Sequence, residues 1–390
     1  MISPKEFHST LSASGVEFFT GVPDSLLKEF CSYVDAVMPP QAHVIAANEG
    51  SAVALAAGYY LGTGRIPLVY MQNSGLGNSV NPLLSLVDRE VYSLPMVLLI
   101  GWRGEPGVRD EPQHLKQGRV MPALLDSMEV PWREIDGDPF SAANAASWAA
   151  ETALKLSAPV ALLVRKGAFE KAEESSKPIP LEGATMLREA AVEVISSSLQ
   201  EGTVVISTTG MISRELYEVR LRQGQNSARD FLTVGSMGHA SQIAMGIALS
   251  RPDVEVVCID GDGSALMHMG GLATLGSSGL SNITHIVLNN GVHDSVGGQP
   301  TVANQVSLTD IARACNYVVP SKSVYSEDDL RRKLHDLYSK KGPKFMEVRV
   351  VPGSRKDLGR PAESPVRNRD IFLASLSKDL ELGTPKATRT

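Results

Sequence analysis

The sequence contains little cysteine and has no excess of positive charge. Only Cys31, Cys258 and Cys315 occur among 390 residues, and they stand far apart. Isolated cysteines predict neither a disulfide framework nor a cysteine-based zinc site, and they fit a reducing cytoplasm. The formal net charge of -6 argues against nucleic acid and membrane as partners.

Long apolar runs are also missing. The first residues, Met1 to His8, have no apolar core of a signal peptide, and Glu49 interrupts an alanine-rich segment. No stretch is long enough to cross a bilayer, so we expect no secretion signal and no membrane span. Hydrophobic and charged contents of 43% and 21% are typical of a globular protein with a buried core.

The length and the apolar pattern predict two α/β domains in series. A chain of 390 residues fits two domains of roughly 150 to 200 residues. Short apolar runs, separated by segments long enough for crossover helices, predict buried parallel strands. These runs are 18–22, 44–47, 68–71, 96–100 and 160–164, then 204–207, 232–234, 254–260, 285–288 and 345–350. We therefore predict two doubly wound parallel-sheet domains, 1–168 and 185–382, with an exposed linker at 169–184 and a polar tail at 383–390.

Two predicted strands of the second half end in glycines and oxygen-bearing side chains. One runs into Asp260-Gly261-Asp262-Gly263-Ser264, and the next ends in Asn289-Asn290-Gly291. Ligands of doubly wound sheets bind at the carboxyl ends of strands, and glycines let backbone amides approach a diphosphate. Asp262 and Asn290 are hard oxygen donors that suit magnesium. Either motif alone would be an ordinary turn, and a Rossmann site would need Gly-x-Gly-x-x-Gly, which is absent.

This pair of motifs resembles the cofactor-binding motif of the thiamine diphosphate-dependent enzymes. The resemblance implies that Asp262, Asn290 and the Val292 carbonyl hold Mg²⁺, and that the motif glycines and Ser264 contact the diphosphate. It also implies that Met237 supports the folded cofactor, although Met237 could instead fill a core. The cofactor-binding residues implied by the resemblance are Thr208, Thr209, Gly210, Gly235, Ser236, Met237, Gly261, Gly263, Ser264 and Asn290.

The first half supplies an acidic residue at the start of a predicted helix. Glu49 stands before the helix 52–60. In isolation it would merely favour the helix dipole. The segment 49–58 resembles the pyrimidine-binding helix of the family, which implies that Glu49 binds the aminopyrimidine ring nitrogen and acts as the catalytic carboxylate.

Three further segments predict contacts to an anionic 2-oxo acid. A loop at 101–116 and a second loop at 353–361 concentrate cations in an acidic protein. Either loop could instead be solvated. Asp24 follows the first predicted strand and could move a proton, or it could cap a helix at 25–31. The predicted substrate contacts are Ser25, Arg103, Arg109, Lys116, Arg355 and Arg360, and the predicted proton donor is His114 or Asp24.

Together these segments closely resemble the branch of the family that decarboxylates 3-phosphonopyruvate, with the sulfopyruvate decarboxylases as nearest relatives. The resemblance covers about residues 1 to 380. It implies a homodimer or larger homo-oligomer in which one subunit completes the site of another. Larger relatives carry a middle domain, for which a chain of 390 residues has no room. The two halves are fused, which favours phosphonopyruvate and a role in phosphonate biosynthesis. Sulfopyruvate or another short 2-oxo acid, carboligation and an inactive cofactor-binding partner remain alternatives.

Overall fold

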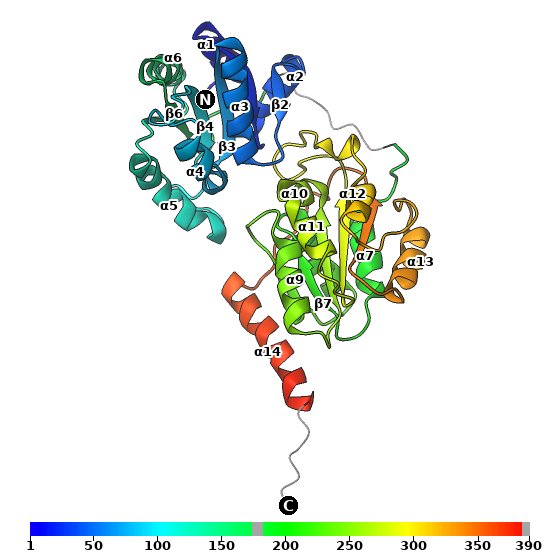
Figure 1. The fold of residues 1–390 in the computed structure, drawn as a ribbon. Coiled ribbons are helices and arrows are strands. Elements are labelled where there is room, and N and C mark those ends of the chain that lie inside the picture. Colours follow the sequence, from blue (N-terminus) through cyan, green and yellow to red (C-terminus); the bar gives the residue numbers. More distant parts are fainter. Residues whose placement is uncertain (174–181, 384–390) are drawn as a thin grey trace, which may run out of the picture. The chain divides into compact units, whose positions relative to one another are not determined.

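The computed structural model describes residues 1–173 and 182–383 (Figure 1). It divides into unit 1, Met1–Pro178 with His293–Thr301, and unit 2, Ile179–Val292 with Val302–Thr390. The division falls inside the predicted linker 169–184, whose residues 174–181 lie outside the described residues. Residues 384–390 of the predicted tail also lie outside them.

Unit 1 is built on a six-stranded parallel sheet in the order β2-β1-β3-β4-β6-β5. Its strands are β1 Val16–Gly21, β2 His43–Ile45, β3 Ile66–Gln72, β4 Met96–Gly101, β5 Trp132–Ile135 and β6 Pro159–Val164. Its helices are α1 Pro4–Ala13, α2 Lys28–Val37, α3 Glu49–Thr63, α4 Leu76–Ser85, α5 Pro112–Ser127 and α6 Pro139–Leu156, with a 3-10 turn at Asn73–Gly75.

Helices cover both faces of this sheet, which explains why its central strands are apolar throughout. Every residue of β4 and β6 is buried, as expected for parallel strands between two helical layers. The helices α1, α2 and α6 share one core cluster with alternate strand residues such as Val97 and Leu99. The helices α3, α4 and α5 share the other cluster, with Leu98 and Ile100.

Unit 2 has a five-stranded parallel sheet in the order β11-β10-β9-β7-β8. Its strands are β7 Val204–Ser207, β8 Asp230–Leu232, β9 Val256–Gly261, β10 Ile283–Asn289 and β11 Lys344–Arg349. Its helices are α7 Arg188–Ser198, α8 Met211–Arg222, α9 Ala240–Ser250, α10 Asp262–Met267, α11 Gly270–Gly276, α12 Leu308–Ala314, α13 Glu327–Tyr338 and α14 Pro365–Gly383, with a 3-10 turn at Val302–Asn304. Two core clusters again lie on opposite faces. Within the described residues, no helix combines the length and apolar character needed to span a membrane.

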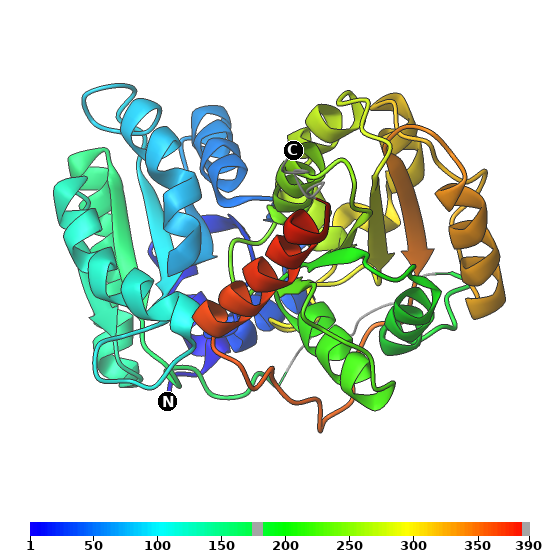
Figure 2. The ribbon, with the colours of Figure 1, turned by 90° about the horizontal axis from the view of Figure 1, so that it is seen from below.

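The last helix of unit 2 protects an edge of its sheet. The Asn368 side chain on α14 accepts from the Leu232 amide at 3.2 Å and donates to the Asp230 carbonyl at 3.0 Å. The rings of Phe231 and Phe372 pack edge to face at 5.6 Å. In Figure 2, α14 is the red helix that these contacts hold against unit 2. The backbone of edge strand β8 is thus partly satisfied by a side chain, which blocks pairing with another strand.

Three local features differ from the sequence-based expectations. The edge strand β5 was not predicted because its residues Trp132, Arg133 and Glu134 are not buried and form no apolar run. The second helix begins at Lys28 rather than at residue 25. Phe169, at the start of the predicted linker, is instead buried in the core of unit 1 beside Phe7 and Phe30.

The strand order places a ligand-binding position in each sheet. In unit 1 the chain passes from β1 to β2 on one side and then returns to β3 on the other. In unit 2 it does the same from β7 to β8 and then to β9. Ligands of doubly wound sheets bind where the strand order reverses, beyond the carboxyl ends of the strands. The expected ligand-binding positions are therefore the segments that follow β1 and β3 in unit 1, and β7 and β9 in unit 2.

Candidate active site

In unit 2 the reversal point carries a hydroxyl pair next to a glycine amide. Thr208 follows β7 and Ser264 lies on α10 after β9, and their Oγ atoms are 2.9 Å apart. The Gly238 amide donates to Ser264 Oγ at 3.0 Å. Gly238 has a φ of +86°, and a Cβ there would overlap the His268 ring. Of the predicted cofactor residues, the structure thus brings Thr208 and Ser264 together and sets the glycine-rich segment 235–238 beside them.

The predicted metal residues lie at the ends of two neighbouring strands. Asp262 is the first residue of α10, after β9, and Asn290 directly follows β10; both are buried. β9 and β10 pair in parallel, with Leu288 opposite Gly261. The Asn290 Oδ1 atom accepts from the Val292 amide at 3.1 Å, which fixes the turn that carries the predicted Val292 carbonyl ligand. This is an oxygen donor set of the kind that Mg²⁺ prefers.

Other buried polar residues hold these strand ends in place. Asn289 donates to Glu347 on β11 at 2.7 Å and accepts from the Gly291 amide at 3.0 Å. Asp260 lies 3.2 Å from the His285 Nε2 atom on β10. The two adjacent asparagines therefore differ in function: Asn289 ties β10 to β11, and Asn290 lies at the predicted metal position.

The remaining predicted cofactor residues occupy the turns around this cradle. Met237 is only partly buried, and it is not a member of the core clusters formed by the described residues. That placement disfavours the core-filling alternative for Met237. Gly261 is the last residue of β9, and the segments that follow β7, β8 and β9 contain Thr209, Gly210, Gly235, Ser236 and Gly263.

In unit 1, Glu49 is buried at the first residue of α3. Asn48 caps the helix by accepting from the Ser51 amide at 2.9 Å. The Asn78 side chain on α4 donates to Glu49 Oε2 at 2.7 Å. Gly75 packs against the other side of the carboxylate, since a Cβ on Gly75 would overlap it. A buried carboxylate with a fixed orientation suits a ring nitrogen of a ligand.

Asp24 lies at the reversal point of the same unit and is fully buried. Its Oδ2 atom accepts from the Leu26 amide at 2.9 Å, and its Oδ1 atom accepts from the Gln72 side chain at 2.6 Å. Gly101, at the end of β4, leaves room for the carboxylate. Burial raises the pKa of Asp24, although these hydrogen bonds and the positive charge of Arg103 oppose the rise. Asp24 makes a local turn and does not cap α2, whose N-cap residue is Leu27.

Arg103 connects the predicted cationic loop to this position. Its guanidinium pairs with both carboxylate oxygens of Asp110, with Nε 2.8 Å from Oδ2, and its Nη1 donates to Ser25 Oγ at 2.7 Å. Burial and the charge of Arg103 together lower the pKa of His114 to about 4, although Asp110 and Glu111 oppose this shift. His114 is therefore neutral near pH 7 and is the weaker of the two predicted proton donors. Arg109 and Lys116 on the same loop and helix are exposed.

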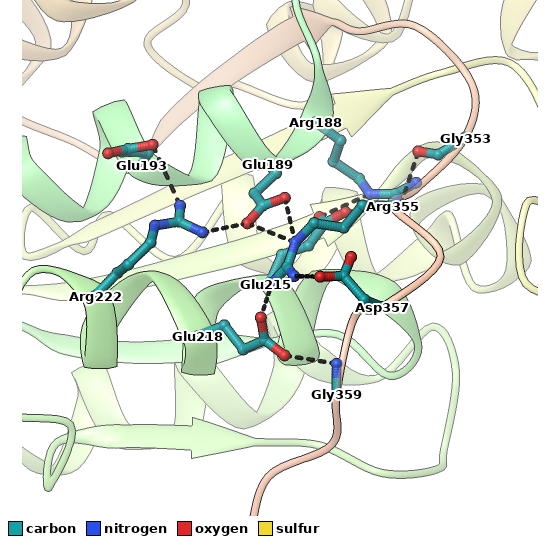
Figure 3. Close-up of polar contacts among 10 residues, drawn as sticks. All are labelled: Arg188, Glu189, Glu193, Glu215, Glu218, Arg222, Gly353, Arg355, Asp357 and Gly359. Atoms are coloured by element: carbon teal, nitrogen blue, oxygen red, sulfur yellow. Dashed lines mark hydrogen bonds and ion pairs between the residues drawn. The ribbon is translucent and has the colours of Figure 1, made fainter.

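Arg355 of the second predicted cationic loop lies in an ion-pair cluster of unit 2 (Figure 3). It contacts Glu189 at 3.0 Å, Asp357 at 3.1 Å and also Glu218, while Glu189 pairs with Arg222 at 2.7 Å. Three carboxylates around one guanidinium would repel a phosphonate. This set of contacts favours a role for Arg355 in anchoring its loop on α7 and α8 over the predicted substrate contact. Arg360 lies on the same loop and is exposed.

Sequence reasoning overlooked Gln72, Asn78, Gly75 and Asp110, which hold the predicted residues in place. Gln72 could have been predicted from the sequence, since it is a polar residue at the end of an apolar strand, as are several of the predicted site residues. Asn78 and Asp110 are ordinary polar residues in the sequence. Their contacts to Glu49 and Arg103 exist only in the folded chain.

Both halves of the chain are similar to known proteins. Residues 6–129 match the family model "Thiamine pyrophosphate enzyme, N-terminal TPP binding domain", and residues 208–348 match the C-terminal TPP binding domain. Phosphonopyruvate decarboxylases of Streptomyces viridochromogenes and Streptomyces hygroscopicus are 37% and 36% identical, over 96% and 94% of this chain and 95% and 92% of theirs. A sulfopyruvate decarboxylase of Methanosarcina acetivorans is 26% identical over 91% of this chain and 93% of its own.

The chain belongs to the thiamine diphosphate-dependent decarboxylases. The recognition of this family, the two parallel-sheet domains and the cofactor are thereby confirmed. The sulfopyruvate decarboxylase of Methanosarcina acetivorans also spans both halves, so fusion of the halves does not distinguish the two substrates.

The donors present in each unit fit thiamine diphosphate. Unit 2 offers hydroxyl groups and a glycine amide at Thr208, Ser264 and Gly238 for a diphosphate, and buried oxygens at Asp262 and Asn290 for its metal. Unit 1 offers the buried carboxylate of Glu49 for a ring nitrogen.

Proposed function

We propose that the chain decarboxylates 3-phosphonopyruvate to phosphonoacetaldehyde and carbon dioxide, with thiamine diphosphate and Mg²⁺, in phosphonate biosynthesis. The observation that carries this proposal is the identity of 36–37% with two proteins named phosphonopyruvate decarboxylase, over at least 94% of this chain. Bound cofactor supplies the electron-accepting centre that the loss of carbon dioxide from a 2-oxo acid requires.

Different residues of the chain bind the metal, the diphosphate and the pyrimidine ring. Asp262, Asn290 and the Val292 carbonyl hold the metal, and Thr208, Ser264 and the glycine amides bind the diphosphate. Glu49 holds a proton at the ring nitrogen of the pyrimidine. Its burial and its hydrogen bond from Asn78 support this role, because a carboxylate shielded from water exchanges a proton with its partner more readily than with solvent.

Asp24 donates a proton to the carbon that loses carbon dioxide. Burial raises the pKa of this carboxyl group, which keeps the proton available at a higher pH than in an exposed aspartate. His114 has a pKa of about 4, so it holds no extra proton near neutrality. Between the two predicted donors, the pKa directions support Asp24.

The phosphonate group binds to exposed cations of the loop at 101–116. Arg109 and Lys116 are exposed, and Arg103 lies between Asp110 and Ser25. Charge-assisted hydrogen bonds from such side chains suit a tetrahedral oxyanion. Pyruvate lacks this group, so the cations distinguish 3-phosphonopyruvate from it.

The chain acts as a homodimer or larger assembly in which the pyrimidine-binding unit of one subunit serves the diphosphate-binding unit of another. The outer side of α3 supports this proposal, because Leu55 and Leu61 are exposed there beside the exposed glycines Gly58 and Gly62. An apolar helix face with small residues is a typical contact surface. We expect sedimentation velocity to show a dimer or larger species, and Leu61→Arg to shift it toward monomer; a monomeric wild type would contradict this.

A cytoplasmic location is supported by three free thiols.

The second candidate substrate is sulfopyruvate, which the full-length match to a sulfopyruvate decarboxylase supports. A decisive experiment measures carbon dioxide release by the purified chain with thiamine diphosphate and Mg²⁺, and compares kcat/KM for 3-phosphonopyruvate, sulfopyruvate and pyruvate. The proposal requires the highest value on 3-phosphonopyruvate. A higher value on sulfopyruvate would replace it, and no turnover of any acid would leave the alternative of a cofactor-binding partner. Product analysis with an added aldehyde tests carboligation.

A further inference from the structure

We propose that Gln72 is a positioning residue that allows Asp24 to gain and lose its proton while it stays buried. This inference rests on the proposed decarboxylation, in which Asp24 acts as the proton donor. It concerns a residue of β3 that does not itself meet the reacting carbon.

The geometry joins the two residues across the point where the strand order of unit 1 reverses. Gln72 is the last residue of β3, and Asp24 follows β1, the neighbouring strand. The Gln72 Nε2 atom donates to Asp24 Oδ1 at 2.6 Å, and its Oε1 atom accepts from Ser74 Oγ at 2.7 Å. The second carboxylate oxygen already accepts from the Leu26 amide at 2.9 Å. Gln72 is therefore the side-chain hydrogen-bond partner of Asp24 and is itself held by Ser74.

A buried carboxyl group that repeatedly loses and regains a proton needs a hydrogen-bond partner that can both donate and accept. The ionised form only accepts hydrogen bonds, whereas the neutral form donates one. A side-chain amide can serve both forms, because a half-turn exchanges its NH₂ group for its carbonyl oxygen. In the rotated state Gln72 accepts from neutral Asp24 and donates to Ser74, whose hydroxyl group also donates or accepts. In either state, the Asp24 carboxyl group keeps its hydrogen bond to Gln72, and this matters because an unpaired buried polar group destabilises the fold.

None of the charged and titratable groups named below can hydrogen-bond to both protonation states of Asp24 as Gln72 can. Arg103, which follows β4, lowers the pKa of Asp24 by its charge, but its donors are directed to Asp110 and Ser25. Burial raises the pKa of the Cys31 thiol on α2, which keeps that neighbour neutral. An arginine has no acceptor atom, so it cannot bond to the proton of neutral Asp24.

The proton step balances without another reactant. Neutral Asp24 gives its proton to the carbon that carried the carboxylate, and this proton takes up the electron pair left when carbon dioxide departs. Asp24 is then ionised, with Gln72 and the Leu26 amide as donors. Water returns the proton before the next turnover.

The test replaces Gln72 by methionine, which has a similar length but neither a donor nor an acceptor of comparable strength. Gln117→Met, at an exposed position on α5, is the matched control. We expect the basic limb of the pH profile of kcat to move upward by about one pH unit or more in Gln72→Met, because the ionised form of Asp24 loses a charge-assisted hydrogen bond. The control should keep the wild-type profile.

A second measurement does not depend on turnover. The infrared carbonyl band of protonated Asp24, identified by its loss in Asp24→Asn, is followed against pH in the protein without substrate. The band should vanish at a higher pH in Gln72→Met than in wild type. If Gln72→Met does not fold, Gln72→Glu should shift it in the same direction, because two adjacent carboxyl groups share one proton. An unshifted band in the folded variant overturns the inference. A wild type that decarboxylates no 2-oxo acid overturns the proposed function instead, whatever the band does.

Discussion

Gly75 packs directly against the carboxylate of Glu49. The two residues come from different elements: Gly75 ends the 3-10 turn after β3, and Glu49 begins α3. A Cβ at position 75 would overlap the carboxyl group and the adjacent side-chain carbon of Glu49. The absence of a side chain on Gly75 therefore decides where the predicted catalytic carboxylate lies.

Gly75→Ala should displace the Glu49 carboxylate and impair catalysis more than folding. We expect kcat to fall about a hundredfold, because a shift of the order of 1 Å in a catalytic group is costly. Gly77→Ala is the matched control, since no atom lies within 4 Å of a Cβ at that exposed helical position. The control should keep full activity and gain about 0.5–1 kcal/mol of stability. Equal kcat in both variants would argue against the assigned position of Glu49.

Glu49→Gln should retain the fold and lose the proton chemistry. Glutamine has the same length and can still accept from the Asn78 side chain, which bonds to Glu49 Oε2 at 2.7 Å. We expect kcat to fall about 10²- to 10⁴-fold, the usual contribution of an acid–base group. Circular dichroism should match wild type, and Glu151→Gln, on the exposed side of α6, should remain fully active. Wild-type turnover by Glu49→Gln would exclude Glu49 as the catalytic carboxylate.

Asp262→Ala should weaken cofactor binding in a manner that depends on magnesium. Asp262 is buried at the end of β9, next to the end of β10 that carries Asn290. Loss of a charged oxygen ligand should weaken thiamine diphosphate binding by more than about tenfold in the presence of Mg²⁺. Titration calorimetry with and without Mg²⁺ provides the measurement. The metal assignment does not survive if affinity is unchanged under both conditions.

Arg109→Ala and Arg355→Ala should separate substrate binding from loop anchoring. Arg109 is exposed, so its replacement should reduce kcat/KM for 3-phosphonopyruvate about tenfold to a hundredfold and leave pyruvate almost unaffected. Arg355 pairs with Glu189, Glu218 and Asp357. Arg355→Ala should keep the ratio of the two specificity constants and increase hydrogen exchange at residues 353–360. If the ratio of kcat/KM for 3-phosphonopyruvate to that for pyruvate fell in Arg355→Ala and not in Arg109→Ala, Arg355 would again be the expected substrate contact.

Asp24→Asn should make the protein more stable at pH 7. Burial raises the pKa of Asp24 in the folded state, so the folded protein binds this proton more tightly than the unfolded chain. The stabilisation that this bound proton gives the folded protein is complete below the pKa of Asp24 in the unfolded chain, about 3.9. It is lost as the pH rises through the pKa of Asp24 in the folded protein. Urea unfolding should therefore show a gain for Asp24→Asn at pH 7 that shrinks toward pH 4. The exposed control Asp336→Asn should show no such trend; a destabilised Asp24→Asn at pH 7 would contradict it.

Strands that are buried on both faces could be located from the sequence. All ten predicted runs overlap strands of the structure; 204–207 coincides with β7, whereas 232–234 shares only Leu232 with β8. Such strands need apolar residues at every position, which leaves a continuous signal. The edge strand β5, with the sequence Trp132-Arg133-Glu134-Ile135, has one side open to solvent and leaves no such run. The start of α2 was also misplaced, because no side chain caps it and its boundary depends on packing.

The sequence by itself determined the chemical inventory: glycines and oxygen donors after strands, and an acidic residue at the start of a helix. These positions follow from local patterns of apolar residues, glycines and polar residues along the chain. Only the tertiary structure decided which polar groups meet. Gln72 reaches Asp24 and Asn78 reaches Glu49 because parallel strands bring distant segments to one edge. Arg355, equally cationic in the sequence, is held by carboxylates of α7 and α8, since the nearest charges in space, not in the chain, decide what a guanidinium binds.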